Sequence, residues 1–233
     1  DDEGRALVSV GLHCLGRRLL VADEIHALPR IERFGGRTVD ADRYTDAQLL
    51  SLEIERVFKR SWIVAVPTWK VAEPNSYAVL QESGIDVVVT RDAKGVLRAF
   101  RNSCLHRGSR LVHGCGKAKM MQCEYHGWKY ALDGRLASVP AANGFGSVDV
   151  SKMRLQPIHM QVAGGLVWVF LGEDPPPFDA HLSGIAEQWA PYQLDEMTPI
   201  EERVFTIPVN WKSMLENAFD YYHVAQVHRH TIH

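Results

Sequence analysis

Two short segments, each with one cysteine and one histidine, constrain this chain of 233 residues more than any other feature. One residue separates Cys104 from His106, and two residues separate Cys123 from His126, which follow after 16 intervening residues. Thiolate and imidazole are ligands for zinc and for iron–sulfur clusters, whereas magnesium and calcium prefer oxygen ligands. The four side chains therefore predict a metal centre that the fold assembles from two loops.

The grouping of the ligands distinguishes between zinc and iron. Zinc fingers usually pair cysteine with cysteine and histidine with histidine, whereas each segment here supplies one of each. A Rieske 2Fe-2S cluster needs that arrangement, because two cysteines hold one iron and two histidines hold the other. Gly108 and Gly127 follow the ligands and predict tight turns, and Trp128 is expected to shield the cluster. A structural zinc ribbon is the alternative.

The residues around these ligands resemble the Rieske non-haem iron oxygenases, the family that includes the α subunits of aromatic-ring-hydroxylating dioxygenases. The resemblance rests on residues 104–108, 123–130 and 133–136. Rieske proteins of respiratory complexes have two further cysteines that form a disulfide, at the positions of Gly108 and Tyr125 here. Because the chain lacks them, it resembles the oxygenase or ferredoxin branch of these proteins.

Length and composition are those of a globular protein. With 46% hydrophobic and 23% charged residues, the chain can form one large core or two small ones. A net charge of −2 gives no reason to expect a nucleic-acid partner. No apolar run approaches the roughly 20 residues of a membrane span. We therefore predict a soluble protein without a membrane association, and a cytoplasmic one, because thiolate iron–sulfur chemistry suits a reducing compartment.

The residue pattern predicts an α+β fold in three parts. Residues 1–61 are expected to be an N-terminal helical segment that packs on the catalytic part, with one helix within residues 1–40 and an amphipathic helix over 45–62 capped by Thr45 or Asp46. Residues 62–173 are expected to be an antiparallel β domain with the ligand loops at hairpin tips. Residues 174–233 begin with a proline-rich linker, continue with a strand over 202–207, and enter an incomplete catalytic domain.

A second group of metal-ligand residues lies in that last part. Glu216, Asp220 and His223 share one face of a helix that is predicted from Lys212 onward. His223 and His228 are five residues apart, which on a regular helix directs their rings about 140° apart. The helix must therefore end, bend or bulge between them if both are to bind one ion. Two histidines and one carboxylate, with open positions, are typical of non-haem Fe(II) oxygenases.

Residues 210–228 also resemble the start of the catalytic domain in the same oxygenase family. The resemblance implies that His223 and His228 bind a mononuclear iron. It implies that Asp220 is the catalytic link that hydrogen-bonds His223 and, across a subunit boundary, His126 of a neighbouring chain. The third ligand of the family is an acidic residue beyond His233, so the sequence is expected to be the front part of an α subunit.

Three further residues of this region are expected not to bind the iron. Glu216 is interpreted as a supporting carboxylate, and His230 and His233 as the trailing edge of a loop.

The predicted function is that of the oxygenase component of a Rieske non-haem iron oxygenase. The resemblance implies that a reductase or ferredoxin passes electrons from NAD(P)H to the 2Fe-2S cluster, and that the mononuclear Fe(II) uses O2 to hydroxylate an aromatic or other small organic substrate, as in aromatic hydrocarbon catabolism. It also implies a homotrimer, with or without a β subunit. Two alternatives stay open: an electron-transfer protein without oxygenase activity, and a monooxygenase or demethylase of the same family.

Overall fold

The computed structural model describes residues 39–82, 85–145 and 149–230. Its contacts divide the chain into two compact units, one of residues 54–200 and one that joins the first 53 residues to residues 201–233. The helix predicted within residues 1–40 lies outside the described residues, apart from residues 39 and 40.

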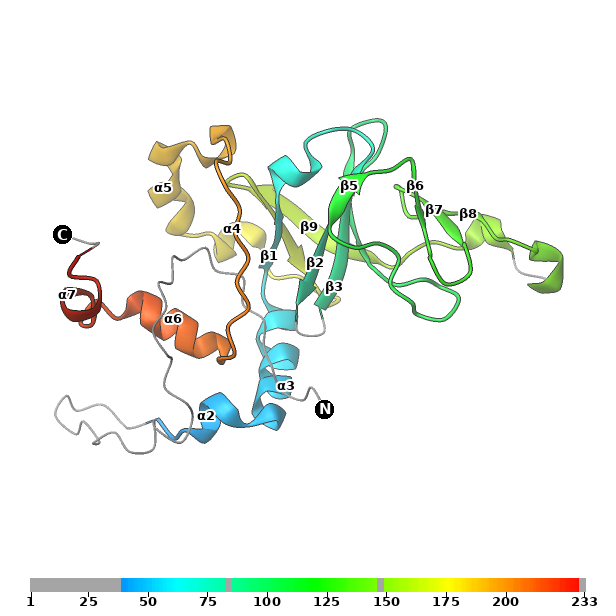
Figure 1. Cartoon of the computed structure of the whole chain (residues 1–233). Coiled ribbons are helices and arrows are strands. Elements are labelled where there is room, and N and C mark those ends of the chain that lie inside the picture. The colour runs from blue at the N-terminus through cyan, green and yellow to red at the C-terminus, as the bar shows by residue number, and fades with distance from the viewer. Residues whose placement is uncertain (1–38, 83–84, 146–148, 231–233) are drawn as a thin grey trace. The chain divides into compact units, whose positions relative to one another are not determined.

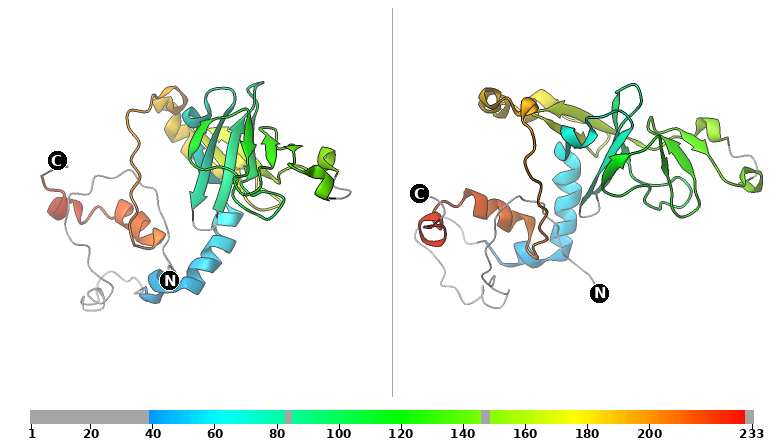
Figure 2. Two further views of the ribbon diagram at one scale, coloured as in Figure 1. Left: turned by 45° about the vertical axis from the view of Figure 1, so that its right-hand side comes forward. Right: turned by 45° about the horizontal axis from the view of Figure 1, so that its top comes forward.

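The unit of residues 54–200 is built mainly of antiparallel strands (Figure 1). Seven strands form one sheet in the order β1-β10-β9-β4-β3-β2-β5, and three form a smaller sheet in the order β6-β7-β8. The smaller sheet lies to one side of the larger one (Figure 2). The strands are β1 Ile63–Pro67, β2 Ser76–Glu82, β3 Ile85–Arg91, β4 Leu97–Arg101, β5 Cys115–Lys117, β6 Met120–Gln122, β7 Lys129–Ala131, β8 Leu136–Ser138, β9 Pro157–Ala163 and β10 Leu166–Phe170. The predicted α+β class with an antiparallel β domain is thus confirmed.

The larger sheet packs on both of its faces. Successive side chains of a strand point to opposite faces, and β3 shows the consequence. Val88 lies in a core that also contains Cys104 and Cys123. Val87 and Val89 lie in a second core, on the other face of the strand. One face of the sheet therefore supports the bases of both ligand loops.

The turn between β7 and β8 is the hairpin that Asp133 and Gly134 predicted. Gly134 has a φ of +84°, a conformation that residues with a Cβ rarely adopt. A Cβ at this position would also lie 2.5 Å from the ring of Phe100. The turn can therefore close over the sheet only with glycine.

The segment after the proline run packs on the β structure. Trp62 donates a hydrogen bond from its indole nitrogen to the carbonyl oxygen of Pro176, 2.9 Å away. Trp62, Trp168, Phe170 and Leu182 form a third buried cluster. The helices here are α4 Phe178–His181 and α5 Ile185–Trp189. The boundary that was predicted at residue 174 thus falls inside this unit, because apolar residues beyond the prolines are buried against it.

The other unit is helical, with α2 Asp42–Thr45, α3 Ala47–Arg56, α6 Trp211–Phe219 and α7 Val224–Val227. Asp46 caps α3, since its carboxylate accepts hydrogen bonds from the backbone N–H groups of Gln48 and Leu49 at 2.7 and 3.3 Å. The single helix predicted over 45–62 is divided, because this cap starts a new helix after α2 and α3 gives way to a 3-10 turn, η1 Phe58–Arg60.

Two carboxylates, Glu53 on α3 and Glu216 on α6, join α2 and α3 to α6 by hydrogen bonds. The Glu53 carboxylate accepts hydrogen bonds from the Trp211 indole at 2.8 Å and from the Lys212 ammonium at 2.7 Å. The Tyr44 hydroxyl donates to the Glu216 carboxylate at 2.8 Å. The N-terminal helical residues thus hold the helix that leads to the second group of metal-ligand residues.

The strand predicted over residues 202–207 is wrong. These residues are described, and they form no strand. Val204, Phe205 and Ile207 are residue types that favour strands. A strand forms, however, only where a neighbour pairs its backbone groups. In the described part of the chain, no strand lies beside them.

The described helices are short. The longest, α3, has ten residues. None of the helices in the described ranges is both long and apolar enough to cross a membrane.

Candidate metal centres

The first ligand loop connects β4 to β5 and carries Cys104 and His106. It is not the hairpin tip that the sequence predicted, because β3 and β2 lie between β4 and β5 in the sheet. Within the loop, the Cys104 N–H donates to the Ser109 carbonyl at 2.7 Å, and the Gly108 N–H donates to the Cys104 carbonyl at 2.8 Å. These two hydrogen bonds fold the ligand segment into one tight turn.

The second ligand loop is a hairpin tip, between β6 and β7. The Cys123 N–H donates to the Trp128 carbonyl at 2.9 Å, and the Gly127 N–H donates to the Cys123 carbonyl at 2.9 Å. These are the same two bonds, at the same spacing from the cysteine, as in the first loop. Gly108 and Gly127 also share a positive φ, +73° and +71°. The two loops thus adopt one turn geometry although different strands support them.

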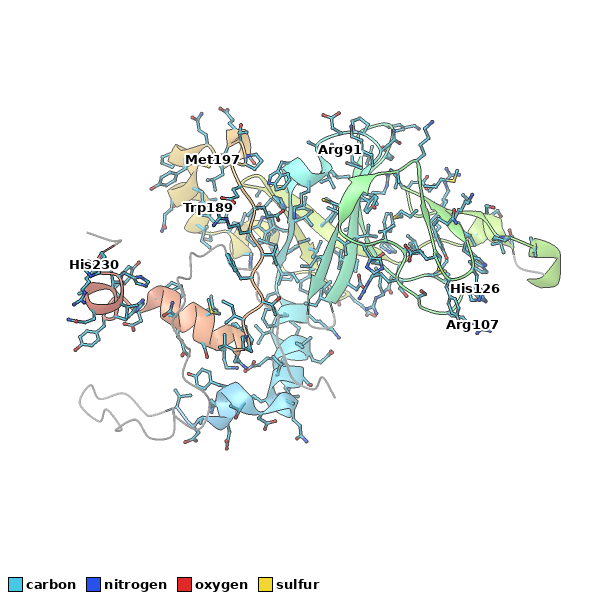
Figure 3. The ribbon with its side chains drawn as sticks, in the orientation of Figure 1. Arg91, Arg107, His126, Trp189, Met197 and His230 are labelled. Atoms are coloured by element: carbon cyan, nitrogen blue, oxygen red, sulfur yellow. The ribbon has the colours of Figure 1, made fainter. Side chains whose placement is uncertain are left out.

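The loops bring together the four side chains that the sequence singled out. The thiols of Cys104 and Cys123 are buried, with 3% and 1% of each residue exposed. The imidazoles lie nearer the surface, and the Nδ1 atoms of His106 and His126 are 3.2 Å apart. His126 and Arg107 lie at the same outer end of the unit (Figure 3). The centre therefore has a sulfur side inside the protein and a nitrogen side facing outward.

This arrangement fits a Rieske cluster better than a single zinc ion. Two nitrogen ligands on one tetrahedral metal, each about 2.1 Å from it, lie about 3.4 Å apart, close to the observed separation of 3.2 Å. The described residues hold no group of three or more His, Cys, Asp or Glu side chains that could bind one ion. A structural zinc site needs four ligands on one ion, whereas each iron of a Rieske cluster takes only two protein ligands.

The ionisation of the ligands follows from their surroundings. Burial raises the pKa of the Cys104 thiol, so this proton must leave when a metal binds. Desolvation, followed by the nearby His126 and Arg107, lowers the pKa of His106. A neutral imidazole is the form that binds metal. The surroundings of His106 therefore favour the neutral form that binds metal, whereas those of Cys104 favour the protonated thiol.

Tyr130 links the two loops and was not identified from the sequence. It lies on β7, just after the second loop, yet its hydroxyl is 3.2 Å from the Cys104 sulfur and accepts a hydrogen bond from the Leu105 N–H at 3.0 Å. Burial raises the pKa of Tyr130 far above its usual value, so the phenol stays protonated and can donate to the sulfur. The one indication of its role in the sequence was its position within the motif of residues 123–130.

Trp128 covers one of the imidazoles. Its ring stacks on that of His106, with centroids 5.0 Å apart and planes at 7°. Only 3% of Trp128 is exposed. The position agrees with the shielding role that was expected for this residue.

The second group of metal-ligand residues lies after α6. The predicted helix through His223 is wrong in its end point, because α6 stops at Phe219 and Asp220 is extended, with φ −84° and ψ 96°. The Asp220 carboxylate accepts a hydrogen bond from the Tyr222 N–H at 2.8 Å, a local bond that competes with the helix. The helix thus ends before His223, and not between the two histidines.

His223 and His228 flank the short helix α7 and face each other. Their ring centroids are 5.3 Å apart, at an interplanar angle of 69°. The Asp220 carboxylate lies 3.3 Å from Nδ1 of His223. With Nδ1 directed at the carboxylate, Nε2 is the nitrogen that can bind a metal. The structure therefore brings these three residues together.

The other candidates in this region lie apart from the pair. Glu216 does not share a face with Asp220 and His223, because α6 ends between them, and its carboxylate binds Tyr44 instead. His230 accepts a hydrogen bond from the Arg229 side chain at 3.1 Å. His233 lies outside the described residues.

Two known protein families match parts of the sequence. Residues 61–154 match the Rieske 2Fe-2S domain, and residues 194–233 match the catalytic domain of the ring-hydroxylating alpha subunit. Together the two domains imply a Rieske 2Fe-2S cluster and a mononuclear iron.

The curated relatives are monooxygenases or oxygenase subunits of monooxygenases. The oxygenase subunit of glycine betaine monooxygenase from Pseudomonas aeruginosa is 33% identical over 186 residues, which are 79% of this chain and 43% of the relative. The oxygenase subunit of carnitine monooxygenase from Escherichia coli is 31% identical over 194 residues, or 82% of this chain and 52% of the relative. Choline monooxygenase from Spinacia oleracea is 32% identical over 208 residues, or 87% and 47%. The chain thus spans about half the length of these relatives.

Solved structures agree with this relationship. The quaternary ammonium Rieske monooxygenase CntA with bound L-carnitine superposes with a TM-score of 0.74 and 31% identity, over 81% of this chain and 54% of that one. Naphthalene 1,2-dioxygenase from Rhodococcus superposes with a TM-score of 0.66 and 26% identity, over 81% and 46%.

Proposed function

Since the chain belongs to the family of Rieske non-haem iron oxygenases, we propose that it is part of a monooxygenase that acts on quaternary ammonium compounds. In this proposal, Cys104, His106, Cys123 and His126 hold the 2Fe-2S cluster. His223 and His228 bind the mononuclear iron. The observation that carries the proposal is that one chain contains both ligand sets, whereas an electron carrier needs only the cluster.

The substrate class follows from the relatives. Glycine betaine, carnitine and choline share a trimethylammonium group, and the relatives named for them match this chain at 31–33% identity. The aromatic substrate and dioxygenase reaction expected from the sequence are supported less well, because the naphthalene dioxygenases match at 26–29% identity and lower TM-scores.

Residues near the proposed iron site have suitable chemistry for such a cation. A trimethylammonium group has no N–H to donate, so proteins recognise it with aromatic faces. The exposed side chains Phe219, Tyr221 and Tyr222 flank Asp220 and precede His223 directly. They are candidates for walls of the substrate site.

Electron supply is part of the same proposal. A monooxygenase reduces one oxygen atom of O2 to water with two electrons and two protons, and transfers the other atom to the substrate. The electrons would come from NAD(P)H through a reductase or ferredoxin in the cytoplasm. Asp220, oriented by His223 and the Tyr222 N–H, would accept a hydrogen bond from a cluster histidine of a neighbouring chain in a homotrimer, with or without a β subunit.

The visible and EPR spectra of the purified chain test the cluster. A Rieske cluster absorbs visible light and gives an EPR signal when reduced, whereas a zinc protein is colourless and silent. A colourless chain that contains zinc would overturn the proposal.

Product analysis tests the reaction and the substrate. A chain extended to the length of its relatives, supplied with a reductase, NADH and O2, is expected to oxidise carnitine, choline or glycine betaine and to leave naphthalene unchanged. Oxidation of naphthalene alone would overturn the substrate class. In the same system, Asp220→Asn should abolish turnover while the cluster stays reducible, and unchanged turnover would remove Asp220 from the electron path.

A further inference from the structure

The strands at the two ends of the first ligand loop do not pair with each other. The second loop is closed at its base by Gln122 and Lys129, which pair in the β6–β7 ladder. The first loop, residues 102–112, leaves β4 and leads to β5, and these strands are not neighbours in the sheet. β4 and β5 each pair with other strands, but no ladder joins one end of this loop to the other.

The side chain of Asn102 performs this closure. Its amide NH2 donates to the Val112 carbonyl and to the Asp86 carboxylate, both at 2.8 Å. Its amide oxygen accepts from the N–H groups of Leu111 and Val112, at 3.3 and 3.2 Å. An asparagine amide has two donors and two acceptor positions, so all four are used. Three of the four bonds join the first residue of the loop to its last two.

Asn102 is also tied to the sheet beneath the loop. Its backbone N–H donates to the carbonyl oxygen of Asp86 on β3, at 3.0 Å. The Asp86 carboxylate also pairs with the guanidinium of Arg110, a residue of the same loop. Only 1% of Asn102 is exposed. A buried polar group whose bonds are all satisfied allows one arrangement and penalises any other.

We propose that Asn102 is a positioning residue of the cluster site: its amide fixes both ends of the first ligand loop and so sets the positions of Cys104 and His106 relative to Cys123 and His126. The inference rests on the proposed cluster ligands. Metal sites tolerate displacements of only about 0.5 Å in their ligands, so a loop with unfixed ends would hold the cluster in altered geometry. The Asp86–Arg110 pair supports the amide from the side of the sheet.

The test uses two variants of different severity. Asn102→Asp keeps the shape of the side chain and its two accepted bonds, but it loses both donated bonds and places a second carboxylate beside Asp86. It is expected to lower the iron and sulfide content per chain at least threefold, and to alter the EPR spectrum and reduction potential of the cluster that remains. Asp86→Asn keeps an acceptor for Asn102 and removes only the charge that pairs with Arg110. It should retain the cluster, with a smaller change of the same kind.

Thr90→Val is the matched control for a loss of stability without a loss of positioning. The Thr90 hydroxyl is fully buried on β3 and donates to the Leu132 carbonyl at 2.8 Å, outside both ligand loops. This variant should lower the melting temperature while the spectrum and potential stay those of the wild type.

The outcomes separate this inference from the proposed function. A wild-type chain without a Rieske spectrum refutes the proposed cluster itself. A wild-type chain with the spectrum, and Asn102→Asp with the same spectrum and potential at a lower melting temperature, refutes only the positioning role. If Asn102→Asp does not fold, Asp86→Ala decides, because it removes the acceptor of one of the two bonds that the Asn102 amide donates. A native spectrum and potential in that variant overturn the inference.

Discussion

The two ligand loops have the same turn but different supports. In each, the cysteine N–H and carbonyl and a glycine with positive φ make the same pair of hydrogen bonds. The second loop is held by the ladder of a hairpin, and the first by the amide of one buried asparagine. The comparison teaches that hydrogen bonds within each turn set the local geometry of its ligands. The contacts at the base of each loop, in contrast, set where the turn lies in the protein.

Removal of a cysteine thiolate should cause the largest loss of cluster, and the loss should be the same in both loops. A serine hydroxyl is protonated at neutral pH and is a poor ligand for this iron, which is normally held by thiolates. Cys104→Ser and Cys123→Ser should each lower the cluster content more than tenfold, measured as iron and sulfide per chain. A cluster that survives in one of the two variants would show that the loops are not equivalent.

Thiol alkylation compares the loops without a mutation. Cys104 and Cys123 are buried, and Cys115 is exposed on β5. Peptide mapping after iodoacetamide treatment should therefore show Cys115 modified at least about tenfold faster than either ligand. The thiolate is the reactive form, and burial raises the pKa of Cys104. Its rate should consequently rise about tenfold from pH 7 to pH 8. Rapid modification of Cys104 at pH 7 would mean that the first loop is open.

Alanine substitutions at Gly108 and Gly127 should lower the free energy of unfolding by different amounts, because the two glycines have different neighbours. A positive φ costs a residue with a Cβ about 1–2 kcal/mol. At Gly127 the new Cβ would also lie 3.3 Å from the Pro140 ring, whereas at Gly108 the nearest atom is the Ser103 hydroxyl, 3.8 Å away. Gly127→Ala should lose about 2 kcal/mol of unfolding free energy and Gly108→Ala about 1 kcal/mol, measured by urea denaturation. The reverse order would contradict the described packing of the second loop.

Tyr130→Phe removes the hydroxyl that contacts the Cys104 sulfur and the Leu105 N–H, and should lower the free energy of unfolding by about 1 kcal/mol. Its effect on the cluster is more informative. A hydrogen bond to a cluster sulfur stabilises the reduced state, so its loss should lower the reduction potential. Because Tyr130 joins the two loops, the variant tests whether they act as one unit. An unchanged potential would show that the phenol does not donate to the Cys104 sulfur when the cluster is present.

The sequence predicted what depends on near neighbours. The central strands were predicted from short apolar runs between glycine turns. Asp46 was one of the two caps predicted for the helix, and its bonds reach only two and three residues along the chain. The four residues of the first centre were identified from their types and spacing.

Features that depend on distant partners were missed. Asn102 binds Asp86, 16 residues away, and no local pattern marks that pair. The absence of a strand over 202–207 reflects the lack of a neighbour, and the burial of the segment after the prolines depends on Trp62, more than 100 residues earlier. The end of α6 was missed for another reason, since the Asp220 side chain competes with a helix that the residue types alone favour.

The contacts of Asp220 have a consequence for the order of folding. The bonds that Asp220 makes with Tyr222 and His223, and the ring contact between His223 and His228, all join residues at most five positions apart. Closing so short a stretch costs little chain entropy. The two imidazoles can therefore come together before the distant strands of the other unit have paired. The sulfur-containing centre, in contrast, must wait until strands from across its sheet have met.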